Sequence, residues 1–142
     1  MILLDSDHLS VLTDERSSGH ATLKSRLRSS DDQAFATTIV NVEEQIRGWF
    51  AFIKSRPDVH DQIPGYQRLA DLLEVLAQWR ILRFDSRAAD EVKRLRKQKI
   101  RIGTMDLKIA AIALTQGALL LSRNLVDFRK VPGLQVESWL SA

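Results

Sequence analysis

One stretch, from Gly103 to Leu114, limits the possible folds more than any other part of the chain. From Ile109 to Leu114 it contains only Ile, Ala and Leu. A helix that is apolar on nearly all sides lies buried at the centre of its domain. Thr104 is expected to cap this helix, which puts Asp106 in its first turn, where the helix dipole favours an ionised carboxylate. A charge at the mouth of a buried helix needs a partner, either a structural one or a metal ion.

Short apolar or β-branched runs alternate with helical patterns along the rest of the chain. Strands are expected at Ile2–Leu4, 34–40, 81–84 and 118–122, with a last short segment at 135–139. Between them, helices are expected at about 21–29, at 42–54 after an Asn41 cap, after Pro64, and after a Ser86 cap. This alternation predicts an α/β fold, a three-layer α/β/α sandwich around a central parallel sheet of four to five strands. The helices at 42–54 and after Pro64 carry more apolar residues than one core needs, which predicts a projecting helical hairpin with a partner face.

Length and composition exclude several classes of protein. The 142 residues make one domain of ordinary size over residues 1–142, and the absence of cysteine excludes disulfides, thiolate zinc sites and thiol nucleophiles. The first residues lack the basic region of a signal peptide, and no apolar run approaches the roughly 20 residues of a membrane span. We therefore expect a cytoplasmic protein with no membrane partner.

Polar side chains stand at comparable places along the predicted sheet. Asp5 ends the first strand, Glu44 starts the helix after the second, and Asn124 and Asp127 follow the fourth. Because the carboxyl ends of parallel strands share one edge, these residues and Asp106 can converge there. Charged carboxylates that lie close together need a cation, and oxygen ligands suit Mg²⁺ or Mn²⁺. The pattern predicts metal-assisted hydrolysis of a phosphodiester.

Each of these residues also has a structural explanation. An Asp at a strand end or helix start is commonly a cap, and Asn124 could occupy a turn. His8 could join the site through its nearness to Asp5. Ser6 could hydrogen-bond a ligand, although no base is placed to make it a nucleophile.

The basic residues are concentrated in one place. The stretch from Lys93 to Arg101 holds six basic residues and no acid, whereas the other 15 basic residues are outnumbered by 18 acids. Such a stretch is a candidate contact for a nucleic-acid backbone, with the candidate RNA-binding residues Arg94, Lys97, Lys99 and Arg101. The alternative is a solvated helix end, where basic residues favour the dipole.

Four blocks in this order resemble the PIN-domain family, and within it the VapC-type toxins of bacterial toxin–antitoxin pairs. They are Leu3-Leu4-Asp5-Ser6-Asp7-His8-Leu9, Glu44-Gln45-Ile46-Arg47-Gly48, Gly103 to Ala111, and Ser122 to Leu134. The resemblance implies a PIN fold, Mg²⁺-dependent endoribonuclease activity with Mn²⁺ as a possible substitute, a VapB-type antitoxin that blocks the site, and a homodimer. It makes the catalytic acidic ligands Asp5, Glu44 and Asp106. The supporting residues would be Ser6, Asn124 and Asp127, with Asn124 at a position that is Asp in many members.

Two other functions fit parts of the sequence. Asp5 and Asp7 after a first strand resemble a haloacid-dehalogenase-type phosphatase, but position 9 is Leu and Asp106 has no acidic neighbour. A non-catalytic RNA- or antitoxin-binding PIN module should have lost its carboxylates, and all three principal ones are present. The uncharged Asn124 keeps this second alternative open.

Overall fold

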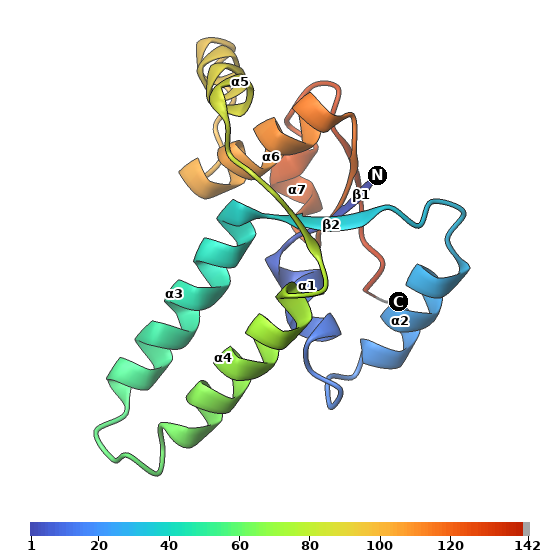
Figure 1. Cartoon of the computed structure of the whole chain (residues 1–142). Coiled ribbons are helices and arrows are strands. Elements are labelled where there is room, and N and C mark those ends of the chain that lie inside the picture. Colours follow the sequence, from blue (N-terminus) through green and yellow to red (C-terminus); the bar gives the residue numbers. More distant parts are fainter. Residues whose placement is uncertain (141–142) are drawn as a thin grey trace.

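The computed structural model describes residues 1–140, which form five strands alternating with seven helices (Figure 1). The strands are β1 (Ile2–Leu4), β2 (Phe35–Thr38), β3 (Arg80–Leu82), β4 (Leu119–Leu121) and β5 (Gln135–Glu137). The helices are α1 (Ser6–Leu12), α2 (His20–Ser29), α3 (Ile39–Ser55), α4 (Ile63–Leu76), α5 (Ser86–Lys97), α6 (Thr104–Gln116) and α7 (Leu125–Phe128). Within these residues, no helix combines the length and the apolar character needed to cross a membrane.

All five strands are parallel, in the order β3-β2-β1-β4-β5, which confirms the predicted α/β fold with a central parallel sheet. The chain adds β2 and β3 on one side of β1, then β4 and β5 on the other. The boundary between β1 and β4 is therefore the topological switch point, where the carboxyl edge of such a sheet forms a crevice. Leu4 pairs with Leu121 in this register, so Asp5 and Ser122 lie side by side on that edge.

The pleat of the strands divides the core into two layers. Leu3 and Leu120 point toward α5, α6 and α7 and pack in one cluster with Ile109, Ile112 and Phe128. The neighbouring strand residues point the other way and pack against α1 and α2 in a second cluster, with Ile2, Leu4, Leu121, Val11, Leu23 and Leu27. Both faces of the sheet are covered, which is why the two central strands, β1 and β4, are apolar without alternation. Residues 109–113 of α6 are almost fully buried, as the sequence predicted.

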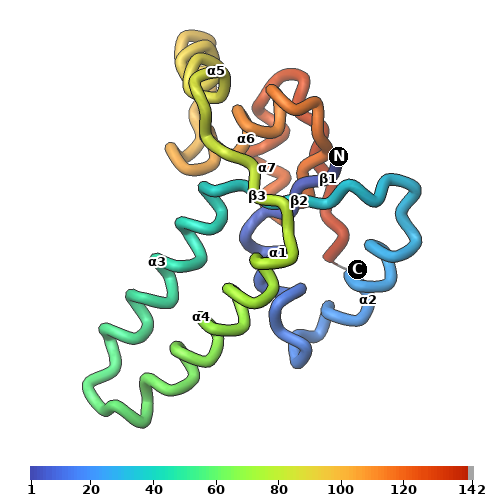
Figure 2. The backbone as a smooth tube through the Cα atoms, viewed as in Figure 1, coloured from blue at the N-terminus to red at the C-terminus, as the bar shows by residue number. Residues whose placement is uncertain are grey.

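Helices α3 and α4 form the predicted hairpin, which projects from the body of the molecule (Figure 1; Figure 2 shows its path as a tube). The two helices approach closely at Gly65, where a Cβ atom would lie 2.7 Å from Ile53 and 2.8 Å from Phe52. Seven large apolar side chains are exposed among residues 1–140, and all except Val126 lie on this hairpin or in its connecting loop: Ile39, Phe50, Val59, Ile63, Tyr66 and Leu73. The hairpin therefore presents apolar surface that the core does not use.

The predicted start of α3 is wrong by three residues. The sequence pattern predicts a strand that continues to position 40, because Ile39 and Val40 are β-branched, and a helix that Asn41 caps. Instead Thr38 is the N-cap, because its hydroxyl oxygen accepts a hydrogen bond from the Asn41 backbone N–H at 3.1 Å. Consequently Glu44 lies in the second turn, and the Asn41 side chain is buried inside the molecule.

Two further caps differ by one residue from the prediction. Asp85, rather than Ser86, caps α5, because its carboxylate accepts a backbone N–H at 2.9 Å. Gly103, rather than Thr104, is the N-cap of α6, without a side-chain hydrogen bond. Asp106 nevertheless lies in the first turn of that helix. These shifts change the caps but leave the predicted carboxylates at the edge of the sheet.

Candidate active site

Three carboxylates from distant segments lie at the carboxyl edge of the sheet, beside the switch point. Asp5 follows β1 and is buried, whereas Glu44 on α3 and Asp106 on α6 are half-buried. Burial raises the pKa of Glu44, and the charges of Asp5 and Asp106 raise it further, whereas the hydrogen bond from Ser6 lowers it. The three carboxylates that the sequence singled out are therefore brought within electrostatic range of one another.

The Asp5 side chain is held at both of its oxygens. Oδ1 accepts hydrogen bonds from the Ser6 backbone N–H at 2.9 Å and from the Asn41 side-chain amide at 2.7 Å. Oδ2 accepts one from the Ser122 hydroxyl at 2.6 Å. Burial raises the pKa of Asp5, the Ser122 hydrogen bond opposes this, and the charge of Asp7 adds to the increase. Asp5 is thus fixed in orientation, although it lies in surroundings that disfavour its charge.

Glu44 is connected to the same group through Ser6. The Ser6 hydroxyl donates to Glu44 Oε1 at 3.0 Å and accepts from the Asn41 amide at 3.1 Å. The next residue on α3, Gln45, donates to the Ser6 carbonyl at 3.0 Å and to the Ser10 hydroxyl at 2.9 Å. Helices α1 and α3 are therefore tied together beside the carboxylates, and Ser6 links Asn41 to Glu44.

Asp106 shares an amide with Asp127. The Asn124 side-chain nitrogen lies 3.2 Å from an oxygen of each of these two carboxylates. Burial raises the pKa of Asp106, as do the charges of Asp5 and then Asp127. These effects act against the helix dipole, which favours the charged form of a carboxylate in the first turn. The Asn124 hydrogen bond and then the Lys130 ammonium at 3.3 Å hold the pKa of Asp127 below its usual range.

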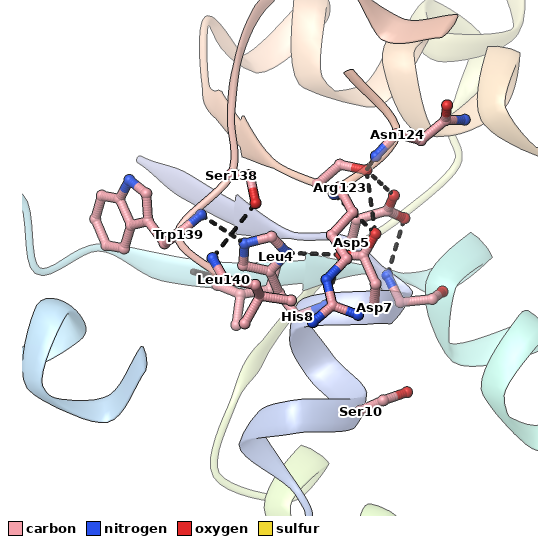
Figure 3. A network of polar contacts seen from close by, with 12 residues as sticks. Leu4, Asp5, Asp7, His8, Ser10, Arg123, Asn124, Ser138, Trp139 and Leu140 are labelled. Carbon is pink, nitrogen blue, oxygen red and sulfur yellow. Dashed lines mark hydrogen bonds and ion pairs between the residues drawn. The ribbon is translucent and has the colours of Figure 1, made fainter. Parts of the chain in front are cut away.

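Asp7 and His8 hold the surrounding segments together (Figure 3). Asp7 Oδ1 lies 2.6 Å from Nδ1 of His8, and Asp7 Oδ2 accepts the Arg123 backbone N–H at 2.9 Å. The His8 ring is fully buried, and its Nε2 accepts the Trp139 backbone N–H at 3.0 Å. Since Nε2 is an acceptor, the ring proton lies on Nδ1, facing Asp7. His8 thus joins α1 to the segment after β5.

The donor set fits a hard divalent cation. All three principal side chains offer oxygen, and a cation would relieve the mutual repulsion that helps to raise the pKa of Glu44 and of Asp106. Among residues 1–140, no three His, Cys, Asp or Glu side chains are already gathered closely enough to hold one ion directly. Mg²⁺ commonly keeps several waters and binds proteins through one or two carboxylates, so such an open arrangement suits it.

The sequence did not identify two residues that the site depends on, Asn41 and Ser122. The sequence pattern predicts a helix cap at Asn41 and the end of a buried strand at Ser122. A usable signal existed for Ser122, because a hydroxyl that directly follows a fully apolar parallel strand lies at the ligand-binding edge. Asn41 could have been identified only by first placing the start of α3 at Ile39, which puts Asn41 inside the first turn rather than at the cap.

The basic stretch, residues 93–101, covers the end of α5 and the first part of the loop that leads into α6. Arg94 pairs with Glu91 one turn earlier on α5, with Nε 3.0 Å from Oε1. Lys97, Lys99 and Arg101 are exposed, and in the described part of the chain none of the three forms an ion pair. Asp106 follows Arg101 by only five residues, so the basic stretch lies close in sequence to one of the three carboxylates.

Comparison with known proteins gives matches at both the sequence and the structure level. The family model for the PIN domain matches residues 2–134. Ribonuclease VapC1 of Rickettsia felis is 52% identical over 42 residues, which cover 30% of this chain and 31% of that protein. VapBC-1 from nontypeable Haemophilus influenzae superimposes with a TM-score of 0.75 at 21% identity, over 99% of this chain and 100% of the other. A toxin–antitoxin complex from Klebsiella pneumoniae gives a TM-score of 0.67 at 22% identity, over 100% of both chains.

Proposed function

The chain belongs to the PIN domain family, and on this premise we propose that it is a Mg²⁺-dependent endoribonuclease, the toxin of a toxin–antitoxin pair. The observation that carries the proposal is the convergence of Asp5, Glu44 and Asp106 at the switch point of the sheet. Burial and the neighbouring carboxylates raise the pKa of Glu44 and of Asp106, and a bound cation would offset the repulsion between these charges. Mn²⁺ has the same preference for oxygen ligands and is expected to substitute.

Asp5 and Asp106 would hold the ion, with Glu44 completing the acidic set. When bound, Mg²⁺ supplies Lewis-acid stabilisation of the phosphoryl oxygens and lowers the pKa of a coordinated water. Ser6 fixes one oxygen of Glu44, which leaves the other oxygen to take a proton from the attacking water. A cation beside Glu44 would favour its ionised form, which is the form that a general base needs.

The similar proteins support a macromolecular substrate and a protein inhibitor. One is named a ribonuclease and another is a toxin–antitoxin complex. We therefore propose RNA as the substrate and a VapB-type antitoxin as the partner that neutralises the enzyme. Both would act in the cytoplasm.

The decisive assay combines the purified protein with RNA in the presence of Mg²⁺ and again with EDTA. We expect cleavage at internal phosphodiesters only when the metal is present. Binding of RNA without cleavage under any divalent metal would support the non-catalytic PIN module instead. Hydrolysis of p-nitrophenyl phosphate without cleavage of RNA would support the phosphatase.

The exposed apolar side chains on the α3–α4 hairpin support a homodimer, with the second copy covering this surface. Replacing Phe50 and Leu73 by Asp places two charges on residues that are 58% and 52% exposed, so the fold should tolerate them. We expect the double variant to be a monomer by light scattering, at concentrations where the unmodified protein is a dimer. The control is Val126→Asp, at an exposed position away from the hairpin, which should leave the mass unchanged. A dimeric double variant would rule out this surface.

The basic stretch before α6 is proposed to hold the RNA backbone. Lys97→Gln combined with Lys99→Gln should weaken RNA affinity and flatten its salt dependence, by about 0.7 in the log–log slope for each phosphate that is no longer neutralised. The measurement is fluorescence anisotropy with catalytically inactive protein over a range of salt concentrations. Lys24→Gln with Arg28→Gln on α2 removes the same charge elsewhere and should leave the slope unchanged. An equal slope for both pairs would mean that the stretch is only a solvated helix end.

A further inference from the structure

One buried side-chain amide lies between two of the three carboxylates. Asn41 has no solvent exposure, and its Nδ2 donates to Asp5 Oδ1 at 2.7 Å and to the Ser6 hydroxyl at 3.1 Å. We infer that Asn41 is the positioning residue of this site, which sets the orientation of Asp5 directly and of Glu44 through Ser6. This inference deepens the proposed function and rests on it for its catalytic consequence, whereas the orientation itself follows from the hydrogen bonds.

Thr38 determines which way the Asn41 amide faces. The Thr38 hydroxyl oxygen accepts the Asn41 backbone N–H, so its own hydrogen is free to donate to Asn41 Oδ1 at 2.7 Å. Since Oδ1 is the acceptor for Thr38, Nδ2 must face Asp5 and Ser6. Thr38 is also fully buried, so water does not compete for these bonds.

The direction of each remaining hydrogen bond follows in turn. Both hydrogens of Asn41 Nδ2 are used, one toward Asp5 and one toward Ser6. The Ser6 oxygen is therefore an acceptor for Asn41, and its hydrogen points to Glu44 Oε1. The hydrogen bonds therefore form a series in which Thr38 donates to Asn41, Asn41 donates to Asp5 and Ser6, and Ser6 donates to Glu44. This series ends on two carboxylates from separate segments, one after β1 and one on α3.

An amide suits this position better than the alternatives of similar shape. Aspartate would add another negative charge against Asp5. Leucine would remove the side-chain donor to Asp5 Oδ1 and the side-chain acceptor of the Thr38 hydroxyl, while the backbone hydrogen bonds of both groups remain. Leaving a buried polar group without its partner costs roughly 1–3 kcal/mol. Partners that orient metal-binding residues typically change metal affinity or activity by about 10- to 100-fold when they are removed.

The experiment compares Asn41→Leu, which keeps the approximate shape of the side chain, with Thr37→Val. Thr37 is equally buried and donates a single hydrogen bond, to the Leu4 carbonyl at 2.8 Å, so it controls for the loss of a buried bond. Titration calorimetry with Mn²⁺ should show about 10- to 100-fold weaker binding for Asn41→Leu and unchanged binding for Thr37→Val. With RNA, Asn41→Leu should lower kcat more than it raises KM. Equal Mn²⁺ affinity for Asn41→Leu and the unmodified protein would overturn the inference.

A second measurement needs no variant and no activity. In ¹⁵N-edited NMR spectra of the metal-free protein, the two Nδ2 protons of Asn41 should be separate, slowly exchanging signals that shift when Mg²⁺ is added. Rapid exchange with water, or signals that do not move with Mg²⁺, would contradict the inference. If the unmodified protein binds Mg²⁺ and shows these shifts but cuts no RNA, the proposed function fails while the positioning role of Asn41 stands.

Discussion

Asp106→Asn is expected to abolish RNA cleavage and, in the metal-free protein, to raise the melting temperature. Loss of the carboxylate removes a ligand of the proposed ion, whose Lewis-acid contribution of several kcal/mol corresponds to at least about a thousand-fold in rate. The same change removes a charge that burial and the neighbouring Asp5 and Asp127 disfavour. Each kcal/mol gained in this way raises the melting temperature of a domain of this size by roughly 3 °C.

The pH dependence of this stabilisation follows from the sign of the pKa shift. The pKa of Asp106 is raised in the folded protein, so the folded state binds a proton more tightly than the unfolded state does. The loss of folding free energy caused by the Asp106 charge is absent below the ordinary pKa of Asp, about 4, and is fully present above the raised pKa of the folded protein. The gap in melting temperature between Asp106→Asn and the unmodified protein should therefore open as pH rises from about 4.

Two comparisons make this result specific. Asp90→Asn removes an exposed carboxylate from α5 and should change neither cleavage nor melting temperature. Saturating Mg²⁺ should stabilise the unmodified protein, by about 2.7 kcal/mol at a hundred times the dissociation constant, and should not stabilise Asp106→Asn. Equal cleavage by Asp106→Asn and the unmodified protein would remove the basis of the proposed function.

Phe128→Ala should cause the largest loss of stability of the changes considered. Phe128 is fully buried beneath the sheet in the layer that also holds α5 and α6. Its removal leaves a cavity and should cost about 3–5 kcal/mol, or roughly 10 °C in melting temperature. Its backbone N–H also donates to the Asn124 carbonyl at 3.2 Å, so loosening of α7 should reach the amide that bridges Asp106 and Asp127.

Val126 provides a control on the same short helix. Its side chain is 77% exposed, and Val126→Ala should change stability by no more than about 0.5 kcal/mol. Urea denaturation of both variants gives the comparison. A loss of less than about 1 kcal/mol for Phe128→Ala would mean that the layer collapses around the gap and that α7 contributes little to the core.

Strong patterns along the sequence were enough to predict the sheet and the central helix. The apolar run at Ile2–Leu4 and the small apolar residues of α6 each have one physical outcome, burial in the centre of the domain. The carboxylates were placed correctly at the edge of the sheet, because parallel strands bring their carboxyl ends to the same side.

The polar support of the carboxylates could not be predicted in the same way. Ile39 and Val40 have strand propensity, yet a helix starts at Ile39, where the Thr38 hydroxyl caps it by accepting the Asn41 backbone N–H. The Ser122–Asp5 hydrogen bond joins residues 117 positions apart, and it depends on strand register rather than on any local pattern. The apolar strand before Ser122 could place its hydroxyl at the edge of the sheet, but propensity and periodicity do not show that it pairs with Asp5.

The pairing of Asp5 with Ser122 also sets the order in which this site can come into existence. A ribosome makes Asp5 well before β4, which positions Ser122, because Ser122 follows Asp5 by 117 residues. A nascent chain that stops before β4 holds Asp5, Glu44 and Asp106 but lacks the contacts that Ser122 and Asn124 make with Asp5 and Asp106. Translation itself therefore delays the contacts that orient Asp5 and Asp106, and a product terminated before β4 would be released without them.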